Sequence, residues 1–321
     1  MSAHGRSEAL IPERAAREGS SVSEASHPDA VARLARALER IESLLPADVE
    51  PDFAAFVAFR WRKRRYLGLE RGELHPVAHP ALIAFEDLMH VDAQKEALRA
   101  NTGQFVRGLP ANNALLTGAR GTGKSSLIRA CLHAFAPEGL RLIEVDKRDL
   151  VDLADIVDRV ASRPERFIVF CDDLSFDANE VGYKELKAAL DGSIAGAAEN
   201  VLIYASSNRR HLMPEYMRDN LGAHYDDDGE VHPTEAVEER VSLSERFGLW
   251  LSFYPFRQDD YLDIVGHWLA SFGLDRAAIV AAQTEALQFA LQRGSRSGRI
   301  ALQFARQWAG QRLSSARPAR G

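Results

Sequence analysis

A glycine-rich segment in the first half of the chain has the residue types that bind phosphate. Residues 118–125 read Gly-Ala-Arg-Gly-Thr-Gly-Lys-Ser, which matches the full Walker A spacing. The glycines let successive backbone N–H groups turn toward the phosphates of a nucleotide. Lys124 would reach the β- and γ-phosphates, and the Ser125 hydroxyl would be offered to Mg²⁺. The residues expected to bind the cofactor are Gly118, Ala119, Arg120, Gly121, Thr122, Gly123, Lys124, Ser125 and Ser126.

The residues on either side of this loop give it the right context. Residues 113–117 are compatible with a short strand, and residues 126–132 continue with apolar positions at helical spacing. A loop between strand and helix presents the free N–H groups and the positive dipole end of the helix to an anion. A glycine-rich turn that happens to carry a lysine is the weaker alternative, since it does not account for the strand and the helix together.

Two carboxylates follow an apolar run further along the chain. Residues 167–171 read Phe-Ile-Val-Phe-Cys, as in a buried parallel strand, and Asp172 and Asp173 come directly after them. The carboxyl end of such a strand lies at the edge of the sheet where the phosphate loop also lies. Asp172 is predicted to hold Mg²⁺ together with Ser125, and Asp173 to polarise the attacking water. Either aspartate could instead cap a turn, an alternative that is closer for Asp173 than for Asp172.

Asn208 ends another apolar stretch, residues 200–208. Its side chain could orient the water that attacks the γ-phosphate, although an asparagine at a strand end is often only a turn residue. Upstream of the loop, Leu88 to Val91 could form the wall of an adenine pocket, or could equally be ordinary core.

The elements that must position these residues alternate between strands and helices. Strands are expected at 113–117, 140–146, 167–173, 200–208 and 249–254, with helical apolar spacing after each of the first three. Three further apolar stripes at helical spacing are expected at 261–269, 279–290 and 300–308. The pattern predicts a five-stranded α/β domain followed by a small helical lid.

The N-terminal part has a different character. Residues 1–28 have few large apolar residues and are expected to be a disordered tail. An amphipathic helix is expected from Asp29 until Pro46 ends it, and a second helix from near Pro51 into the basic run 60–66. That run, Arg-Trp-Arg-Lys-Arg-Arg-Tyr, could grip a nucleic-acid backbone or an acidic partner. The preferred interpretation is a solvated helix end whose cations favour the C-terminal dipole.

Composition limits the class of protein. The chain has 321 residues, enough for a nucleotide-binding domain and one smaller domain. The net charge of -6 gives no global nucleic-acid signature. The first twenty residues are charged without an apolar core and nothing resembles a spanning segment, so a cytoplasmic protein without membrane contact is expected. Cys131 and Cys171 lie in apolar patterns and are expected to be buried hydrophobes rather than metal ligands or a disulfide.

A long polar insertion, residues 211–244, precedes the last expected strand. Its acidic cluster at 226–230 lacks the alternating ligands and the bidentate Glu of a calcium loop, so a solvated loop is the better interpretation. An insertion of this length could bind a partner or substrate.

Taken in order, these motifs resemble an AAA+ ATPase over roughly Ala81 to Leu313. More narrowly, residues 170–176, 204–212 and 244–251 are similar to a bacterial AAA+ family classed only as a domain of unknown function. The resemblance implies a P-loop NTPase (AAA+) fold with a three-layer αβα core, a five-stranded parallel sheet and a small helical C-terminal lid.

The same resemblance implies roles for particular residues. Residues 118–125 would be Walker A, Asp172 and Asp173 Walker B, and Asn208 the first sensor. Arg246 would be an arginine finger supplied in trans, and Arg299 the second sensor in the lid. Either arginine could instead form a surface or interdomain ion pair. Such families usually have Glu where this chain has Asp173, so hydrolysis is expected to be slow or dependent on a partner.

The resulting expectation is an ATPase that uses MgATP to remodel or assemble a macromolecular partner, as a homo-oligomer. The alternatives are a nucleotide-dependent switch or scaffold with little turnover, and a nucleic-acid-associated loader. The expected domains are a tail (1–28), an N-terminal helical region (29–80), an AAA+ core (81–256), a helical lid (257–313) and a second disordered tail (314–321).

Overall fold

The structure is a computed structural model of the whole chain. It describes residues 27–42, 51–66, 68–174, 181–191, 198–208, 224–225, 231–232 and 246–316. The chain divides into two compact units, residues 1–49 and 50–321, each of which is described by itself. In the first unit, α1 (His27–Glu42) is the amphipathic helix expected from the apolar spacing. The two expected disordered tails lie outside the described residues, except that helical residues cover 27–28 and 314–316.

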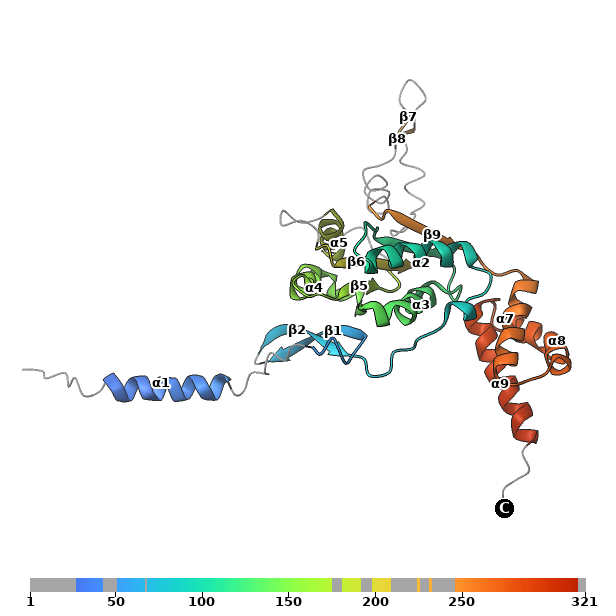
Figure 1. The fold of residues 1–321 in the computed structure, drawn as a ribbon, viewed down its shortest axis with the longest axis horizontal. Helices are drawn as coiled ribbons and strands as arrows, with labels where there is room; N and C mark the ends of the chain where they lie inside the picture. Colours follow the sequence, from blue (N-terminus) through green and yellow to red (C-terminus); the bar gives the residue numbers. More distant parts are fainter. Residues whose placement is uncertain are drawn as a thin grey trace, which may run out of the picture. The chain divides into compact units, whose positions relative to one another are not determined.

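A seven-stranded sheet, drawn in Figure 1, is the centre of the second unit. Its strands lie in the order β2-β1-β4-β5-β6-β3-β9. Five of its strands are the expected ones: β3 (Ala114–Gly118), β4 (Leu140–Val145), β5 (Arg166–Cys171), β6 (Val201–Ser207) and β9 (Leu249–Phe253). All their pairings are parallel, and β3, which leads into the glycine loop, lies between β6 and β9. The carboxyl ends of β3, β5 and β6 therefore meet at one edge of the sheet.

The other two strands replace the helix expected from Pro51 through Tyr66, and that prediction is wrong. Strand β1 (Ala58–Tyr66) runs parallel to β4, and β2 (Leu69–Pro76) pairs antiparallel with β1. Burial has a period of two here, because Phe59 and Trp61 are buried while the intervening Arg60 is exposed. The aromatic residues upstream happen to fit helical spacing as well, which is why periodicity alone misled. The interpretation of residues 60–66 as a helix end is wrong for the same reason.

Helices cover both faces of the sheet. They are α2 (Asp92–Val106), α3 (Lys124–Phe135), α4 (Leu153–Val160) and α5 (Val181–Asp191), with short 3₁₀ turns η2 (Phe85–Asp87), η3 (Ala136–Glu138) and η4 (Lys147–Asp152). Neighbouring residues of one strand face different cores: Leu116 packs with α2 and α3, whereas Leu115 packs with η4, α4 and α5. The three-layer αβα core is confirmed, with seven strands rather than five.

Three helices follow β9 and form the expected lid: α7 (Gln258–Ser271), α8 (Arg276–Gln292) and α9 (Gly298–Ala316). Figure 1 shows them together in orange and red. The buried Tyr261 of α7 donates its hydroxyl to the carbonyl of Ala286 in α8, at 3.1 Å. At the base of the lid, the Gly298 N–H donates to the Gly121 carbonyl at 3.0 Å, so α9 begins against the glycine loop.

Buried polar groups tie α2 to the sheet. The hydroxyl of Tyr204 in β6 accepts from the Asn101 amide at 3.0 Å and lies 2.9 Å from the Thr102 hydroxyl. Because Thr102 donates its hydrogen to the Leu98 carbonyl at 2.8 Å, Tyr204 must be the donor to Thr102. Burial raises the pKa of this tyrosine well above its usual range.

The two cysteines are buried on different elements, Cys131 in α3 and Cys171 in β5, and both are free thiols. Burial raises the pKa of each thiol to about 12, so neither is a ready thiolate. Their expected role as small buried hydrophobes is confirmed.

Of the insertion at 211–244, the structure describes one two-stranded pairing, β7 (His224–Tyr225) with β8 (Val231–His232). The acidic cluster at 226–230 lies outside the described residues. Within the described part of the chain, no helix combines the length and the apolar character needed to cross a membrane.

Candidate functional site

The glycine loop joins β3 to α3 through three residues with positive φ: Gly118 at 134°, Gly121 at 76° and Gly123 at 104°. At Gly118 a Cβ would lie 2.0 Å from the carbonyl oxygen of Phe253, so only glycine lets β3 and β9 approach this closely. Gly123 then caps α3, accepting from Leu127 N–H at 2.8 Å. The loop thus ends at a helix N-terminus, where free N–H groups and the dipole favour an anion.

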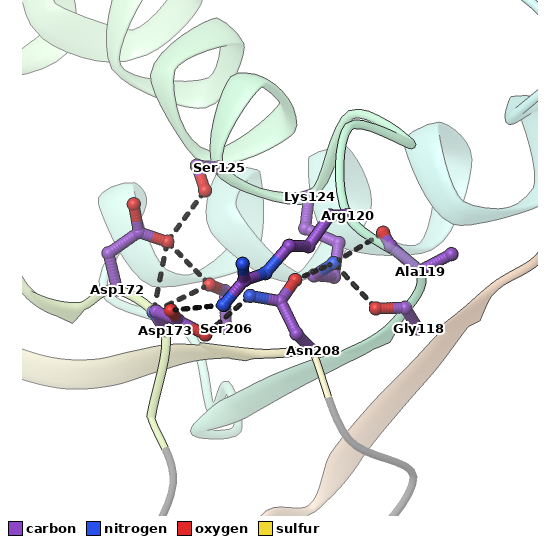
Figure 2. Close-up of polar contacts among 9 residues, drawn as sticks. All are labelled: Gly118, Ala119, Arg120, Lys124, Ser125, Asp172, Asp173, Ser206 and Asn208. Atoms are coloured by element: carbon purple, nitrogen blue, oxygen red, sulfur yellow. Dashed lines mark hydrogen bonds and ion pairs between the residues drawn. The ribbon is translucent and has the colours of Figure 1, made fainter. Parts of the chain in front are cut away.

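Lys124 is the first residue of α3 and is only 5% exposed. Its ammonium donates to the carbonyls of Gly118 and Ala119 at 2.7 and 2.8 Å, and to Asn208 Oδ1 at 3.0 Å (Figure 2). All three acceptors are neutral. Burial lowers the pKa of Lys124 to about 8, even though Asp172 and Asp173 act in the opposite direction. A buried cation that contacts only neutral acceptors would gain from an anionic ligand.

Asp172 follows β5 and gathers hydrogen bonds on one carboxylate oxygen. Its Oδ1 accepts from the hydroxyls of Ser125 at 2.7 Å and Ser206 at 2.5 Å, and from the Asp173 N–H at 3.1 Å (Figure 2). The structure therefore brings the two residues expected to hold Mg²⁺, Ser125 and Asp172, into direct contact. Mg²⁺ usually keeps several water ligands and needs few ligands from the protein. One carboxylate and one hydroxyl therefore fit Mg²⁺ better than a metal whose ligands must all come from protein side chains. Among the described residues no group of three or more His, Cys, Asp or Glu could hold a metal.

Asp173 adopts a left-handed backbone conformation, with φ of 53°. Aspartate and asparagine tolerate this region better than longer side chains do. Its Oδ1 accepts from the Asn208 amide, and its Oδ2 lies 3.6 Å from the Arg120 guanidinium. Since Asn208 also accepts from Lys124, polar contacts run from Lys124 through Asn208 and Asp173 to Arg120, back to the same loop (Figure 2).

A cavity of about 540 Å³ opens beside this network, within the range of small-molecule sites. Its polar part contains Arg120 through Ser126, Asp172, Asp173, Ser206 and Asn208. Its apolar part contains Ile83, Leu88, Met89 and Val91 from the segment before α2, and Phe256, Ile264, Trp268 and Leu302 from the lid side. The cavity thus has a polar end and an apolar end, and Leu88, Met89 and Val91, from the segment predicted to form an adenine wall, line the apolar end.

Two histidines tie the segment before α2 to the lid. His267 Nε2 of α7 lies 2.9 Å from Asp87 Oδ1. His90 lies between two carboxylates of α7, 3.4 Å from Asp260 Oδ1 and 3.3 Å from Asp263 Oδ2. These contacts hold the two walls of the apolar end against each other.

The two arginines implied by the resemblance lie in different places. Arg299, in the first turn of α9, lines the cavity together with Gly298. Arg246 precedes β9, near the amino end of that strand, and is not among the described residues that line the cavity. The structure therefore brings Arg299, but not Arg246, to the site of its own chain.

Several residues of the site were not anticipated. Ser206 is the clearest, because it lies near the carboxyl end of β6, two residues before Asn208, and alternation along this stretch could have identified it. Asp87, His267 and Trp268 had no comparable signal. Their positions depend on how the lid packs on the core, which no local pattern encodes.

A family model described as "Protein of unknown function (DUF815)" matches residues 54–312 of the chain. No curated protein matches it.

Solved structures are similar at low identity. The Aeropyrum pernix Orc1 protein in complex with DNA is 18% identical, with a TM-score of 0.48, over 76% of this chain and 64% of that one. The match therefore spans less than two thirds of the Orc1 chain. A variant of Thermotoga maritima RuvB is 14% identical, with a TM-score of 0.40, over 69% and 70% of the two chains. A chain of the Escherichia coli MS115-1 HORMA:CdnC:Trip13 complex is 14% identical, with a TM-score of 0.43, over 69% and 89%.

Proposed function

The chain belongs to the DUF815 family, and from its site we propose that it is an AAA+ ATPase that binds MgATP between its core and its lid. One observation carries the proposal. The buried Lys124 ends within hydrogen-bond reach of its own loop carbonyls, at a helix N-terminus that opens into a cavity of nucleotide size. A cation, free N–H groups and an apolar recess in this order suit a triphosphate followed by a purine base.

Each end of the nucleotide has its own residues. The N–H groups of the glycine loop would hold the phosphates, and Lys124 would exchange its carbonyl contacts for β- and γ-phosphate oxygens. Ser125 and Asp172 would hold Mg²⁺, which neutralises phosphate charge when bound. The base would lie between Leu88 and Trp268 in the apolar end.

Hydrolysis of the bound ATP would depend on Asp173 and Asn208 of the polar network and on Arg299 of the lid. Asp173 would accept a proton from a water near the γ-phosphate, and Asn208 would orient that water. Arg299 would face the charge that grows on the transferred group, since a guanidinium stays protonated at all working pH values. In the arrangement described, Asp173 is held by Asn208 and Arg120, which supports slow or partner-dependent turnover.

The proposal is tested by measuring nucleotide binding and phosphate release with the purified full chain. Lys124→Ala should abolish ATP binding, whereas Lys95→Ala, a lysine of α2 outside the cavity, should leave it unchanged. Asp173→Asn should keep binding and lose phosphate release. Unchanged ATP affinity in Lys124→Ala would show that the site is assigned wrongly.

A nucleotide-dependent switch or scaffold is the second candidate, favoured by the contacts that occupy both oxygens of Asp173. A measurement of ATP turnover distinguishes the two functions. A protein that binds ATP with Mg²⁺ but releases no phosphate, alone or with cell extract, is a switch.

Arg246 would complete the site of a neighbouring copy if the protein assembles into a homo-oligomer. Mixing two variants provides the test. Arg246→Ala retains an intact glycine loop, and Lys124→Ala retains an intact Arg246. If the arginine acts in trans, the mixture should release phosphate faster than either variant alone. Equal hydrolysis by Arg246→Ala and the wild type would remove this role. The partner that such an oligomer would remodel is to be identified by co-purification.

A further inference from the structure

The β1–β2 hairpin has one strongly basic face. Opposed residues of an antiparallel pair lie on the same face, and the register sets Arg60 opposite His75, Arg62 opposite Glu73 and Arg64 opposite Arg71. We call these six residues the basic face of the hairpin. Four are arginines and one is an acid, so the face is positive although the whole chain is negative.

The opposite face of the hairpin is occupied by this chain. Trp61 is buried there, donating its indole N–H to Asp152 of η4 at 2.9 Å, and Lys63 pairs with the same carboxylate at 3.0 Å. Arg159 of α4 lies over the Trp61 ring, 5.4 Å from its centre. Gly72 leaves room for that ring, since a Cβ would lie 1.9 Å from it. These contacts fix which way the hairpin faces.

The hairpin also extends past the rest of the sheet. Strand β1 pairs with β4 only through residues 58–60, whereas it pairs with β2 from Phe59 to Tyr66. Beyond Arg60 it is therefore a two-stranded ribbon at the end of the sheet order. The basic face of this ribbon lies beyond Ala58, the β1 residue that belongs to the apolar core with α2 and α3.

The charges of this face are only partly compensated. Arg60 pairs with Glu144 at 2.6 Å, and His75 Nε2 lies 3.6 Å from Glu73. The side chains of Arg62 and Arg64 are exposed and, within the part of the chain that the structure describes, make no hydrogen bond or ion pair. Burial lowers the pKa of His75, and Arg64 and Arg62 lower it further, which reflects the positive field at this face.

We propose that the basic face of the hairpin binds double-stranded DNA through its phosphate backbone. Alternate arginines of β1 lie about 7 Å apart along the strand. A two-stranded ribbon fits the major groove of B-DNA, which is about 12 Å wide. Trp61, the tryptophan of this hairpin, is buried on the opposite face and so cannot stack on the bases of a single strand. The narrow major groove of double-stranded RNA would not admit the ribbon.

The salt dependence of binding gives the sharpest measurement. If Arg60, Arg62 and Arg64, the β1 arginines of the basic face, each neutralise one phosphate, log K should fall against log salt with a slope of about −2.7, or about 40-fold from 50 to 200 mM. In the double variant Arg62→Ala/Arg64→Ala the slope of log K against log salt should become less negative by about 1.8. Fluorescence anisotropy with a labelled duplex of about three helical turns measures both.

The matched control is Arg276→Ala/Arg306→Ala, which removes two exposed arginines from α8 and α9. Its net charge is the same as that of Arg62→Ala/Arg64→Ala. It should bind DNA as the wild type does. ATP binding, measured on the same preparations, should be unchanged in both variants, so this test stands apart from that of the ATPase.

Four outcomes would overturn the proposal. The first three are no binding to the duplex at 50 mM salt, an unchanged slope in Arg62→Ala/Arg64→Ala, and tighter binding to single strands or to double-stranded RNA of the same length. A fourth is full displacement of the duplex by poly-glutamate at equal charge concentration, which would assign the basic face to an acidic protein segment instead.

Discussion

The buried lysine makes nucleotide binding depend on pH in a way that can be calculated. In the structure described, the pKa of Lys124 is lowered from 10.5 to about 8. Bound phosphates would stabilise the charged form and raise this pKa again. Above pH 8 the lysine must therefore take up a proton when nucleotide binds, and the apparent affinity must fall as the pH rises.

The size of the effect follows from the fraction of charged lysine. With a pKa of about 8, that fraction is about 0.76 at pH 7.5 and about 0.03 at pH 9.5. If the pKa of the complex lies above this window, the dissociation constant rises by about 25-fold between the two pH values. Phosphate groups titrate near pH 6 and histidines near 6.5, so this window lies above both.

Titration calorimetry in two buffers of different ionisation enthalpy measures the affinity and the proton uptake together. At pH 9.5 the uptake should approach about one proton per nucleotide bound. Lys124→Arg is the control, because a guanidinium stays charged throughout and should remove the dependence if the variant binds. An affinity that stays flat from pH 7.5 to 9.5 in the wild type, with no proton uptake, would refute the role given to Lys124.

Three further substitutions test other parts of the structure. Asp172→Asn should remove the Mg²⁺ dependence of nucleotide binding and lower phosphate release by at least about 100-fold, since the metal supplies several kcal/mol. Tyr204→Phe should lower the free energy of unfolding by about 1–3 kcal/mol in urea titrations, because its buried partners on α2 lose their bonds, whereas the exposed Tyr254→Phe should change it by less than about 0.5 kcal/mol. Gly118→Ala should lower the melting temperature markedly through the clash with the Phe253 carbonyl, and an unchanged melting temperature would contradict this packing of β3 on β9.

The parts of the site that sequence predicted are those encoded locally. Walker A spacing fixes the backbone of one loop, and the acids after an apolar strand must lie at its carboxyl end, so Lys124, Ser125 and Asp172 could be placed together before the structure. Ser206 was missed because strand β6 was read only for its apolar run, without following which face each polar residue occupies.

The hairpin was missed for a different reason. Phe53, Phe56, Val57 and Trp61 satisfy a helical spacing, and arginines and lysines are good helix formers. The alternation of Phe59, Arg60 and Trp61 was the competing signal, and it prevails because β4 offers an edge to pair with and Asp152 a partner for the indole. Both are tertiary contacts, and the same holds for the histidines that join the segment before α2 to the lid.

The hydrogen bond from Gly298 to the Gly121 carbonyl couples the lid mechanically to the glycine loop. Helix α9 has 19 residues and is thus about 28 Å long, with its fixed end at that bond. A reorientation of one loop peptide that tilts the helix by about 5° would displace its far end by about 2.5 Å. Ala301, Phe304 and Trp308 bury α9 in the core that it shares with α7 and α8, so the three lid helices would move together. The last turn of α9 is where the occupancy of the loop should be easiest to detect.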